Sequence, residues 1–470
     1  MNRLWHFDIQ LSTNDNKAIY LQITDTIISA IKSKRLKPLD ILPSTRKLAT
    51  IIGVNRNTLL KALDLLMAEG WLVSKDRVGI FVADLVIEHN IPKTTKKEPV
   101  LEHKKAIIVL DDGVPNTQIA PMKELASAYR RVFSLKSKRN ILGYTNSSGS
   151  ANFRVIIAQM LNHKRGMHVT PSQIFITRGS QMALYLTAQC LLGPKDIILV
   201  ESPGYQPAWT TFRHAGAEIM PINVDDEGLI IEEVEAIVQQ NSAVKAIYVT
   251  PHHQYPTTVT LSLKRRLKLI ELAQIYDFII IEDDYDHEFH FDNRPILPIA
   301  SYTNVKHCIY IGTFSKVVAP ALRIGYLAGN VDLIAKICAL REIIDIQNDP
   351  IMEQAIVELI KNGDIKRHIK RAAKYYKNKK TYLEELLQTH LKDKVHYQTP
   401  TGGLAFWIRP IKKISILELI KNLEKTGVQI MDTSKYNPNH SINGLRLGYG
   451  SIDNKDLEEA IIKLSKLLSV

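Results

Sequence analysis

The sequence has few cysteines and no long apolar run. Cys190, Cys308 and Cys338 stand in apolar surroundings and none pairs with another at metal-ligand spacing, so we expect free thiols in a reducing compartment. No uncharged apolar segment reaches the length that spans a membrane. The first ten residues lack the apolar core and the cleavage site of a signal peptide. These absences predict a cytoplasmic protein.

Length and positive charge are what the sequence has in excess. At 470 residues the chain is too long for one ordinary core, and its hydrophobic fraction of 45 % is ordinary for globular domains. The 61 Lys and Arg against 48 Asp and Glu give a formal net charge of +13. This excess favours an anionic partner such as nucleic acid or phosphate, although a basic enzyme has the same balance.

Three stretches differ in character. Residues 10–84 hold short helical patterns separated by brief turns. Residues 85–106 are polar and lysine-rich, which is typical of an exposed linker. In residues 107–470, apolar strand patterns alternate with longer helical patterns, so we expect an α/β sheet domain with a smaller subdomain from about residue 345. The buried-strand candidates are 174–177, 196–201, 246–251, 278–284 and 308–314.

The first stretch predicts a winged helix. Isoleucines at helical spacing within residues 20–35 indicate a first amphipathic helix. Ser44 is a good N-cap for a second helix that Gly53 ends, and Asn55 can cap a third. Two strand patterns, 71–74 and 79–82, then flank a basic turn. Helices followed by a hairpin are the order of a winged helix.

Polar residues stand where such a domain contacts DNA. The start of a recognition helix reaches base edges, and the free N–H groups that open a helix suit a phosphate. Taken singly, these residues are as well explained as helix caps and surface groups, but their combined spacing favours double-stranded DNA as a partner. The candidate DNA-binding residues are Ser44, Thr45, Arg46, Arg56, Asn57, Thr58 and Arg77.

The stretch from 12 to 84 resembles the GntR-type winged helix. The resemblance rests on LPSTRKLA at 42–49, GVNRNT at 53–58 and AEGW at 68–71. One departure concerns the wing, where Arg77-Val78-Gly79 replaces a Gly-Ser-Gly-like turn.

The second domain carries a lysine suited to an aldehyde cofactor. Lys316 follows an apolar strand and a Ser/Thr pair, and a lysine in this place can form an imine. Ser315 and Arg323 are suited to a phosphate. Asp283, at a strand end, can pair with a protonated pyridine nitrogen, and Tyr285 with a ring hydroxyl. Ligands of open α/β sheets bind at that edge.

Further strand ends add weaker signals of the same kind. Small residues before Ser180 and Gln181 let backbone N–H groups approach a phosphate at a helix start. Tyr205 follows another strand and can stack on a planar ring. His253 and its neighbours follow a fourth strand. None of these histidines has a convincing set of metal partners, so we expect no metal site.

Residues 110–470 resemble fold-type I enzymes that depend on pyridoxal 5′-phosphate, the aspartate aminotransferase family. GLRLGYG at 444–450 and YTNSSGSANFR at 144–154 add to the resemblance. It implies that Lys316 is the Schiff-base lysine, Asp283 the pyridine partner, Tyr285 the ring-hydroxyl partner and Tyr205 the stacking aromatic. It also implies phosphate contacts from Ser180, Gln181, Ser315 and Arg323, and effector contacts from Arg446 and Tyr144. Tyr255-Pro256-Thr257-Thr258 replaces the family's Asn-Pro-x-Gly, which puts efficient proton transfer in doubt.

Together the two halves resemble the MocR subfamily of GntR-type regulators. The resemblance implies a head-to-tail homodimer that senses pyridoxal phosphate or its adduct with an amine and controls vitamin B6, amino-acid or amine metabolism. The main alternative is a working aminotransferase with an accessory winged helix. A second alternative is a DNA-binding protein whose degenerate enzyme domain only dimerises.

Overall fold

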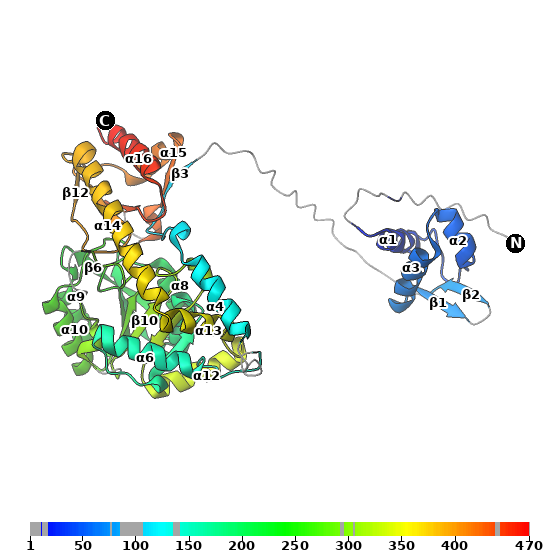
Figure 1. Cartoon of the computed structure of the whole chain (residues 1–470), viewed down its shortest axis with the longest axis horizontal. Coiled ribbons are helices and arrows are strands. Elements are labelled where there is room, and N and C mark those ends of the chain that lie inside the picture. The colour runs from blue at the N-terminus through cyan, green and yellow to red at the C-terminus, as the bar shows by residue number, and fades with distance from the viewer. Residues whose placement is uncertain are drawn as a thin grey trace. The chain divides into compact units, whose positions relative to one another are not determined.

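The computed structural model describes residues 11, 17–75, 78–84, 107–134, 142–291, 296–303, 306–437 and 442–469. The chain divides into two compact units, residues 1–102 and residues 103–470, coloured along the chain in Figure 1. Residues 85–106, where the sequence predicts a linker, lie outside the described residues, as does Arg77.

The smaller unit is a winged helix, as predicted. Its helices are α1 (Ile19–Lys32), α2 (Thr45–Ile52) and α3 (Arg56–Ala68), and its strands β1 (Leu72–Lys75) and β2 (Gly79–Val82) pair antiparallel. The predicted caps are present: Ser44 accepts from the Lys47 N–H at 3.4 Å, and Asn55 Oδ1 accepts from the Asn57 N–H at 2.9 Å. One core joins all three helices to the hairpin, with Ile23, Leu63 and Leu72 each at most 1 % exposed.

An eight-stranded sheet forms the centre of the larger unit. Its order is β4-β11-β10-β9-β8-β5-β6-β7. The pairs from β10 through β9, β8 and β5 to β6 are parallel, whereas β11 lies antiparallel between β10 and β4. The strands are β4 (Ile174–Thr177), β5 (Ile197–Ser202), β6 (Glu218–Asp225), β7 (Gly228–Leu229), β8 (Val244–Val249), β9 (Ile279–Asp284), β10 (Cys308–Thr313) and β11 (Gly325–Ala328).

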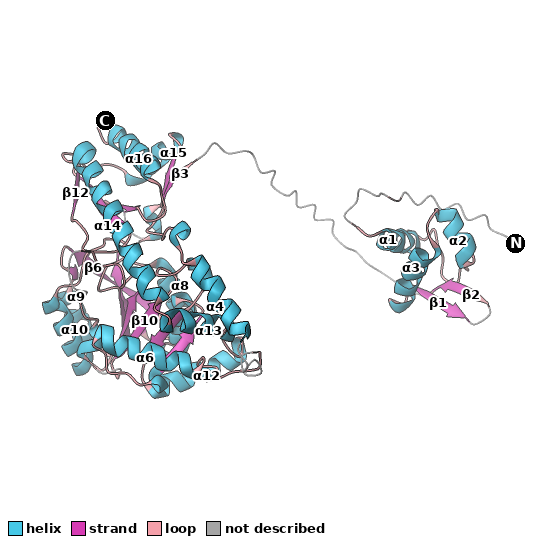
Figure 2. Ribbon diagram, in the orientation of Figure 1, coloured by secondary structure: helices cyan, strands magenta, loops and turns pink. Residues whose placement is uncertain are grey.

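Both faces of this sheet are buried, because successive side chains of a strand point to opposite faces. Ile280 belongs to one core and Ile281 to the other. Figure 2 shows the helices around the strands. The first core takes in α4 (Met122–Ser134), α6 (Ala151–Arg165), α9 (Ile231–Gln240), α10 (Leu263–Ile275), α11 (Ile299–Tyr302) and α13 (Pro350–Lys361). The second takes in α7 (Ser180–Leu191), α8 (Gln206–His214) and α12 (Val331–Ile344).

A third core lies in the smaller part of this unit. The long helix α14 (Asp364–Leu391) joins the two parts: Ile365 packs in the first core and Leu383 in the third. This part holds β12 (Val395–Tyr397), β13 (Ala405–Pro410), β15 (Leu445–Gly448), α15 (Ile416–Lys425) and α16 (Asn454–Leu467). The strand β3 (Ile108–Leu110) pairs in parallel with β14 (Val428–Ile430), so the start of the unit packs beside its end.

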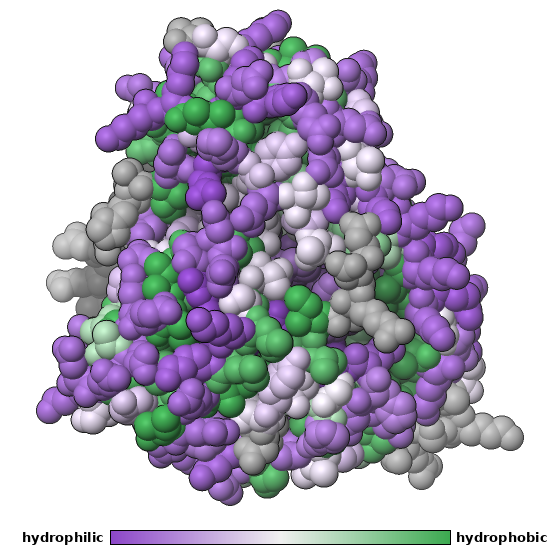
Figure 3. Space-filling view, turned by 90° about the vertical axis from the view of Figure 1, so that its left-hand side faces the viewer, coloured by the Kyte–Doolittle hydropathy of each residue, from purple (hydrophilic) through white to green (hydrophobic). Residues whose placement is uncertain are grey.

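The face of the molecule in Figure 3 is mainly hydrophilic, with apolar residues in patches among the polar ones. Among the described residues, we find no helix with the length and hydropathy that a membrane crossing requires. The predicted fold class, a winged helix with an α/β sheet domain, is confirmed.

Candidate functional site

A cavity opens at the edge where the carboxyl ends of the parallel strands meet. It has a volume of about 260 Å³. β4, β5, β8, β9 and β10 all run toward this edge and deliver the polar residues that follow them, which is where open α/β sheets bind ligands. Every residue predicted to contact the cofactor lines the cavity: Ser180, Gln181, Tyr205, Asp283, Tyr285, Ser315, Lys316 and Arg323. Arg446 lines it too.

The Lys316 amine lies inside this cavity. Its Nζ donates to the carbonyl oxygen of Gly113 at 2.7 Å, which fixes the end of a long and flexible side chain. Burial lowers the pKa of Lys316, and Arg446 adds to that effect. A lower pKa increases the fraction of uncharged amine, the form that attacks an aldehyde. The geometry therefore suits a lysine nucleophile.

Asp283 lines the cavity with a carboxylate, and one oxygen of that carboxylate has no hydrogen-bond donor among the described residues. Its Oδ2 accepts from the Tyr248 hydroxyl at 2.9 Å, whereas its Oδ1 is buried and has no hydrogen-bond partner in the described part of the chain. Burial raises the pKa of Asp283 to about 7. A buried oxygen without a donor is costly, and a protonated pyridine nitrogen would satisfy it. The site therefore fits pyridoxal phosphate at its ring nitrogen.

The hydroxyl of Tyr285 is already engaged. It donates to the carbonyl oxygen of His253 at 2.9 Å. A phenol oxygen keeps acceptor capacity after donating its hydrogen. Tyr285 can thus still accept from a ring hydroxyl, which is compatible with its predicted role.

Backbone and side-chain hydrogen-bond donors also line the cavity. Ser180 and Gln181 open α7, whose first N–H groups have no partner within the helix. The Gln181 amide donates instead to Thr211 Oγ1 at 2.8 Å, so its backbone N–H is the group left for a phosphate. Ser315 Oγ is buried without a partner among the described residues. Together with Arg323, these groups supply hydrogen-bond donors and a positive charge that suit a phosphate.

Gly179 leaves room for the Arg323 guanidinium, because it has no side chain. It has φ +78°, and a Cβ there would lie 2.7 Å from Arg323 Nη2. We expect Gly179→Ala to displace the guanidinium and weaken pyridoxal phosphate binding about 10-fold, the loss of one charge-assisted hydrogen bond. Fluorescence titration measures the change. Gly427→Ala is the matched control, because Gly427 has φ +84° with nothing within 4 Å of the added Cβ. Equal losses in the two variants would show that backbone strain is the cause.

Arg446 is buried in the lining of the cavity and is held by backbone oxygens. Its Nε donates to Asp112 O at 2.8 Å and its Nη1 to Pro256 O at 2.7 Å. The guanidinium lies 4.8 Å from the centre of the Tyr255 ring, and the Tyr255 hydroxyl donates to Asp112 Oδ2 at 2.9 Å. Tyr255 also packs edge-on against Tyr205, with 5.3 Å between ring centres. These contacts thus hold the Arg446 guanidinium in place beside the Tyr255 ring.

The residues that replace the family's Asn-Pro-x-Gly include one with an unusual backbone conformation. Thr258, in the glycine position, has φ +63°. A β-branched residue rarely adopts this conformation. Its backbone N–H donates to Gln254 O at 2.7 Å. Tyr255 lines the cavity in the place of the asparagine.

The sequence reasoning missed several residues of the site. Tyr248 and Thr250 line the cavity from β8 and the residues after it, inside a run that reads as apolar. Asp112 lies next to the predicted linker and reaches the cavity because β3 pairs with β14. Only the folded topology identifies these three.

Glu201 is a buried carboxyl behind the site. It accepts from the Thr250 hydroxyl at 2.6 Å and from the Thr250 N–H at 3.1 Å. Burial raises the pKa of Glu201 to about 7. An exposed glutamate has a pKa of about 4.3. At a pH between the two pKa values, the folded protein therefore holds a proton that the unfolded chain has released. This contribution to stability is lost as the pH rises toward about 7.

Glu201→Gln removes that dependence because an amide does not ionise. From about pH 5 to pH 8, we expect the variant to gain about 2 kcal/mol in unfolding free energy relative to the unsubstituted chain. Urea unfolding of both proteins across the pH range measures it. A difference that stays constant with pH would contradict the raised pKa.

Tyr144 stands apart from the cavity. Its side chain is 86 % exposed, and it is not among the residues that line the site in a single chain. Its predicted effector contact stays a prediction.

The candidate DNA-binding residues lie on the surface of the smaller unit. Arg56 and Asn57 are exposed at the start of α3, with Thr58 partly exposed beside them. Thr45 opens α2. A shallow depression along α2 is lined by Ser44, Arg46, Lys47, Thr50 and Ile51. Two positively polarised helix ends therefore carry arginines into solvent, which suits a DNA backbone.

Comparisons with known proteins agree with both halves. Residues 105–464 match the family described as aminotransferase class I and II, and residues 19–82 match the bacterial regulatory proteins of the gntR family. YdeL of Bacillus subtilis, an uncharacterized HTH-type transcriptional regulator, is 31 % identical over 90 % of this chain and 91 % of its own.

Two further relatives have named roles. MocR of Rhizobium meliloti, a probable rhizopine catabolism regulatory protein, is 27 % identical over 95 % of this chain and 93 % of its own. PdxR of Corynebacterium glutamicum, a pyridoxine biosynthesis transcriptional regulator, is 27 % identical over 98 % of both chains. Among solved structures, kynurenine aminotransferase of Pyrococcus horikoshii, in complex with PMP, is 28 % identical. It has a TM-score of 0.73 and covers 78 % of this chain and 91 % of its own.

Proposed function

Because the chain belongs to the MocR subfamily of GntR-type transcriptional regulators, with a class I and II aminotransferase domain, we propose that it binds operator DNA under the control of pyridoxal phosphate. The winged helix would read the DNA and the larger unit would bind the cofactor. One observation carries this proposal. The same cavity is lined by the Lys316 amine and by Asp283, whose Oδ1 has no hydrogen-bond partner among the described residues.

Each part of the cavity has a role in this proposal. Lys316 would attach the cofactor covalently, and Asp283, which Tyr248 holds in place, would bind the ring nitrogen. Tyr285 would accept from the ring hydroxyl and Tyr205 would pack on the ring. The phosphate would lie among Ser180, the Gln181 N–H, Ser315 and Arg323. When bound, the cofactor supplies an electrophilic carbon and an electron sink.

The effector we propose is pyridoxal phosphate, alone or together with an amine. Arg446 is a fixed cation beside the cavity, which suits an amine that also carries a carboxylate. The relative named for pyridoxine biosynthesis favours control of vitamin B6 metabolism. The relative named for rhizopine catabolism favours control of amine or amino-acid use. We also propose that the protein acts in the cytoplasm and associates with the nucleoid when it binds operator DNA.

We also propose a homodimer, arranged head to tail. Large apolar residues are exposed on two segments that contact each other: Leu142 is 70 % exposed and Ile343 is 83 % exposed. The segments contact each other where the side-chain amide oxygen of Gln347 accepts from the Thr145 hydroxyl at 3.2 Å, and where Ser147 donates to Glu342 at 3.2 Å. Exposed apolar surface of this kind suits a protein partner. A second copy would also be required for Tyr144 to approach a cofactor site.

DNA from upstream of the protein's own gene tests the proposal. Gel-shift titration of the full chain should give specific binding whose affinity changes on adding pyridoxal phosphate. DNA affinity that does not change when the cofactor is added would contradict the regulatory coupling.

An aminotransferase is the second candidate, because Lys316 and Asp283 are chemically sufficient for an amino-transfer half-reaction. Steady turnover of an amino donor with a keto acid would favour it.

A further inference from the structure

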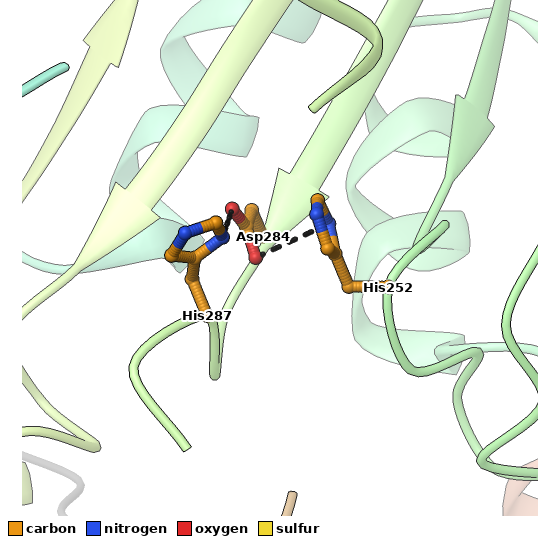
Figure 4. Close-up of side chains that lie close together, drawn as sticks. All are labelled: His252, Asp284 and His287. Carbon is orange, nitrogen blue, oxygen red and sulfur yellow. Dashed lines mark ion pairs between the residues drawn. The ribbon is translucent and has the colours of Figure 1, made fainter. Parts of the chain in front are cut away.

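His252, Asp284 and His287 meet in the interior beside the cofactor cavity, on the other face of the sheet. Adjacent residues of a strand point to opposite faces. Asp283 therefore faces the cavity, whereas Asp284 faces the two histidines shown in Figure 4. The three residues are between 3 and 6 % exposed. One ligand atom from each lies within 4.8 Å of the others.

The tautomer of His252 directs a lone pair at the carboxylate. Its Nε2 lies 2.7 Å from the carbonyl oxygen of Ile296, which can only accept, so Nε2 carries the hydrogen. The neutral ring then presents Nδ1 without a hydrogen to Asp284 Oδ1, 3.5 Å away. Neither atom has a hydrogen-bond partner in the described part of the chain. Two acceptors that face each other in the interior repel unless a cation lies between them.

His287 approaches the same carboxylate from the other side. Its Nδ1 lies 2.8 Å from Asp284 Oδ2, yet the pair does not have hydrogen-bond geometry. Asp284 Oδ2 instead accepts from the Tyr310 hydroxyl at 2.5 Å. The Asp284 carboxylate is thus oriented by Tyr310, as the His252 ring is oriented by Ile296. Partners of this kind around the ligands are typical of metal sites.

We propose that His252 Nδ1, Asp284 and His287 Nδ1 bind a divalent transition-metal ion such as Zn²⁺. Two imidazole nitrogens and a carboxylate are a ligand set that Zn²⁺ accepts, with water in the remaining position. Ligands of tetrahedral Zn²⁺ lie about 3.4 Å apart, for metal–ligand distances of about 2.1 Å. The distances of 2.8 and 3.5 Å between these atoms are close to that spacing. The sequence predicts no metal here, because its histidines have no convincing set of metal partners; His252 joins Asp284 and His287 only in the folded chain.

Such an ion would fix the end of β9 and the turn after it. That segment carries Asp283 and Tyr285, so the metal would brace the cofactor contacts from the opposite face of the sheet. The inference rests on the side-chain cluster alone and does not depend on the proposed regulatory function.

The test uses the full chain, expressed in zinc-supplemented medium, dialysed and analysed for bound metal. We expect one Zn²⁺ per chain. After removal of the metal with a chelator, competition titration with Zn²⁺ should give one site that His252→Gln and His287→Gln each weaken at least about 10-fold. His368→Gln is the matched control: His368 is also buried and bonds a backbone carbonyl, Val317 O, but lies outside the cluster. It should bind Zn²⁺ as the unsubstituted chain does.

Co²⁺ provides a readout that does not depend on the variants folding. Loading the metal-free, unsubstituted chain with one equivalent of Co²⁺ should produce the visible bands of a four-coordinate ion with nitrogen and oxygen ligands. A spectrum identical to aqueous Co²⁺ would overturn the proposal. So would Zn²⁺ binding that is equal in the unsubstituted chain and in His287→Gln.

Discussion

Replacing Lys316 with alanine should abolish the visible absorption of the pyridoxal-phosphate-loaded protein and weaken cofactor binding about 100-fold, or about 2.7 kcal/mol. The reason is that the variant loses the only lysine amine that lines the cavity in the described part of the chain, and with it the covalent bond. The contacts at the phosphate and at Asp283 remain, so binding should weaken rather than vanish. Absorption spectra of the purified variant, titrated with the cofactor, measure both effects.

A second buried lysine provides the control. Lys379, on α14, is 5 % exposed and its amine donates to the carbonyl of Ile452, but it is not among the residues that line the cavity. Lys379→Met should keep the band, which separates loss of the nucleophile from loss of any buried amine. If Lys316→Ala kept the band, another amine would form the bond and the assignment of the site would be wrong.

Replacing Arg56 with alanine should reduce specific operator affinity about 10- to 100-fold, which corresponds to about 1–3 kcal/mol for a contact to a base. Arg56 is the first residue of α3 and its side chain is exposed. It has no part in the core of the unit, so the winged helix should stay folded. Binding isotherms on the operator and on a shuffled sequence measure the change, and the loss should be larger on the operator.

Arg46 provides a contrast at the start of α2. An arginine that contacts phosphate should affect both DNA sequences equally, and Arg46→Ala should reduce the slope of log affinity against log salt by about 1. Lys37→Ala, on the exposed segment between α1 and α2, is the charge-matched control. If Arg56→Ala behaved as Lys37→Ala does, the recognition surface would lie elsewhere.

Local signals explain why so much of the fold could be predicted. Ser44 and Asn55 cap their helices through contacts two or three residues along the chain, so the sequence alone contains the information. The same holds for the strand ends. Asp283 and Lys316 each follow an apolar run, and parallel strands bring such ends to one edge.

What escaped prediction depends on contacts between distant segments. β3 pairs with β14, more than 300 residues away along the chain, and brings Asp112 to the cavity. In the sequence, Tyr248 looks like another residue of an apolar strand. Only the folded structure shows that its hydroxyl donates to Asp283. Asp284 and His287 are three residues apart, but His252 joins them only because the ends of β8 and β9 lie side by side.

The most direct test of the regulatory account is the affinity for pyridoxal phosphate with and without saturating operator DNA. If the cofactor changes DNA binding, linkage requires that DNA change cofactor binding by the same factor, typically about 5- to 150-fold. Titration of the visible band under both conditions gives that factor, and coupling between the two sites predicts a value clearly different from 1 that matches the gel-shift ratio. Identical affinities with and without DNA would show that the two units act independently and would contradict it.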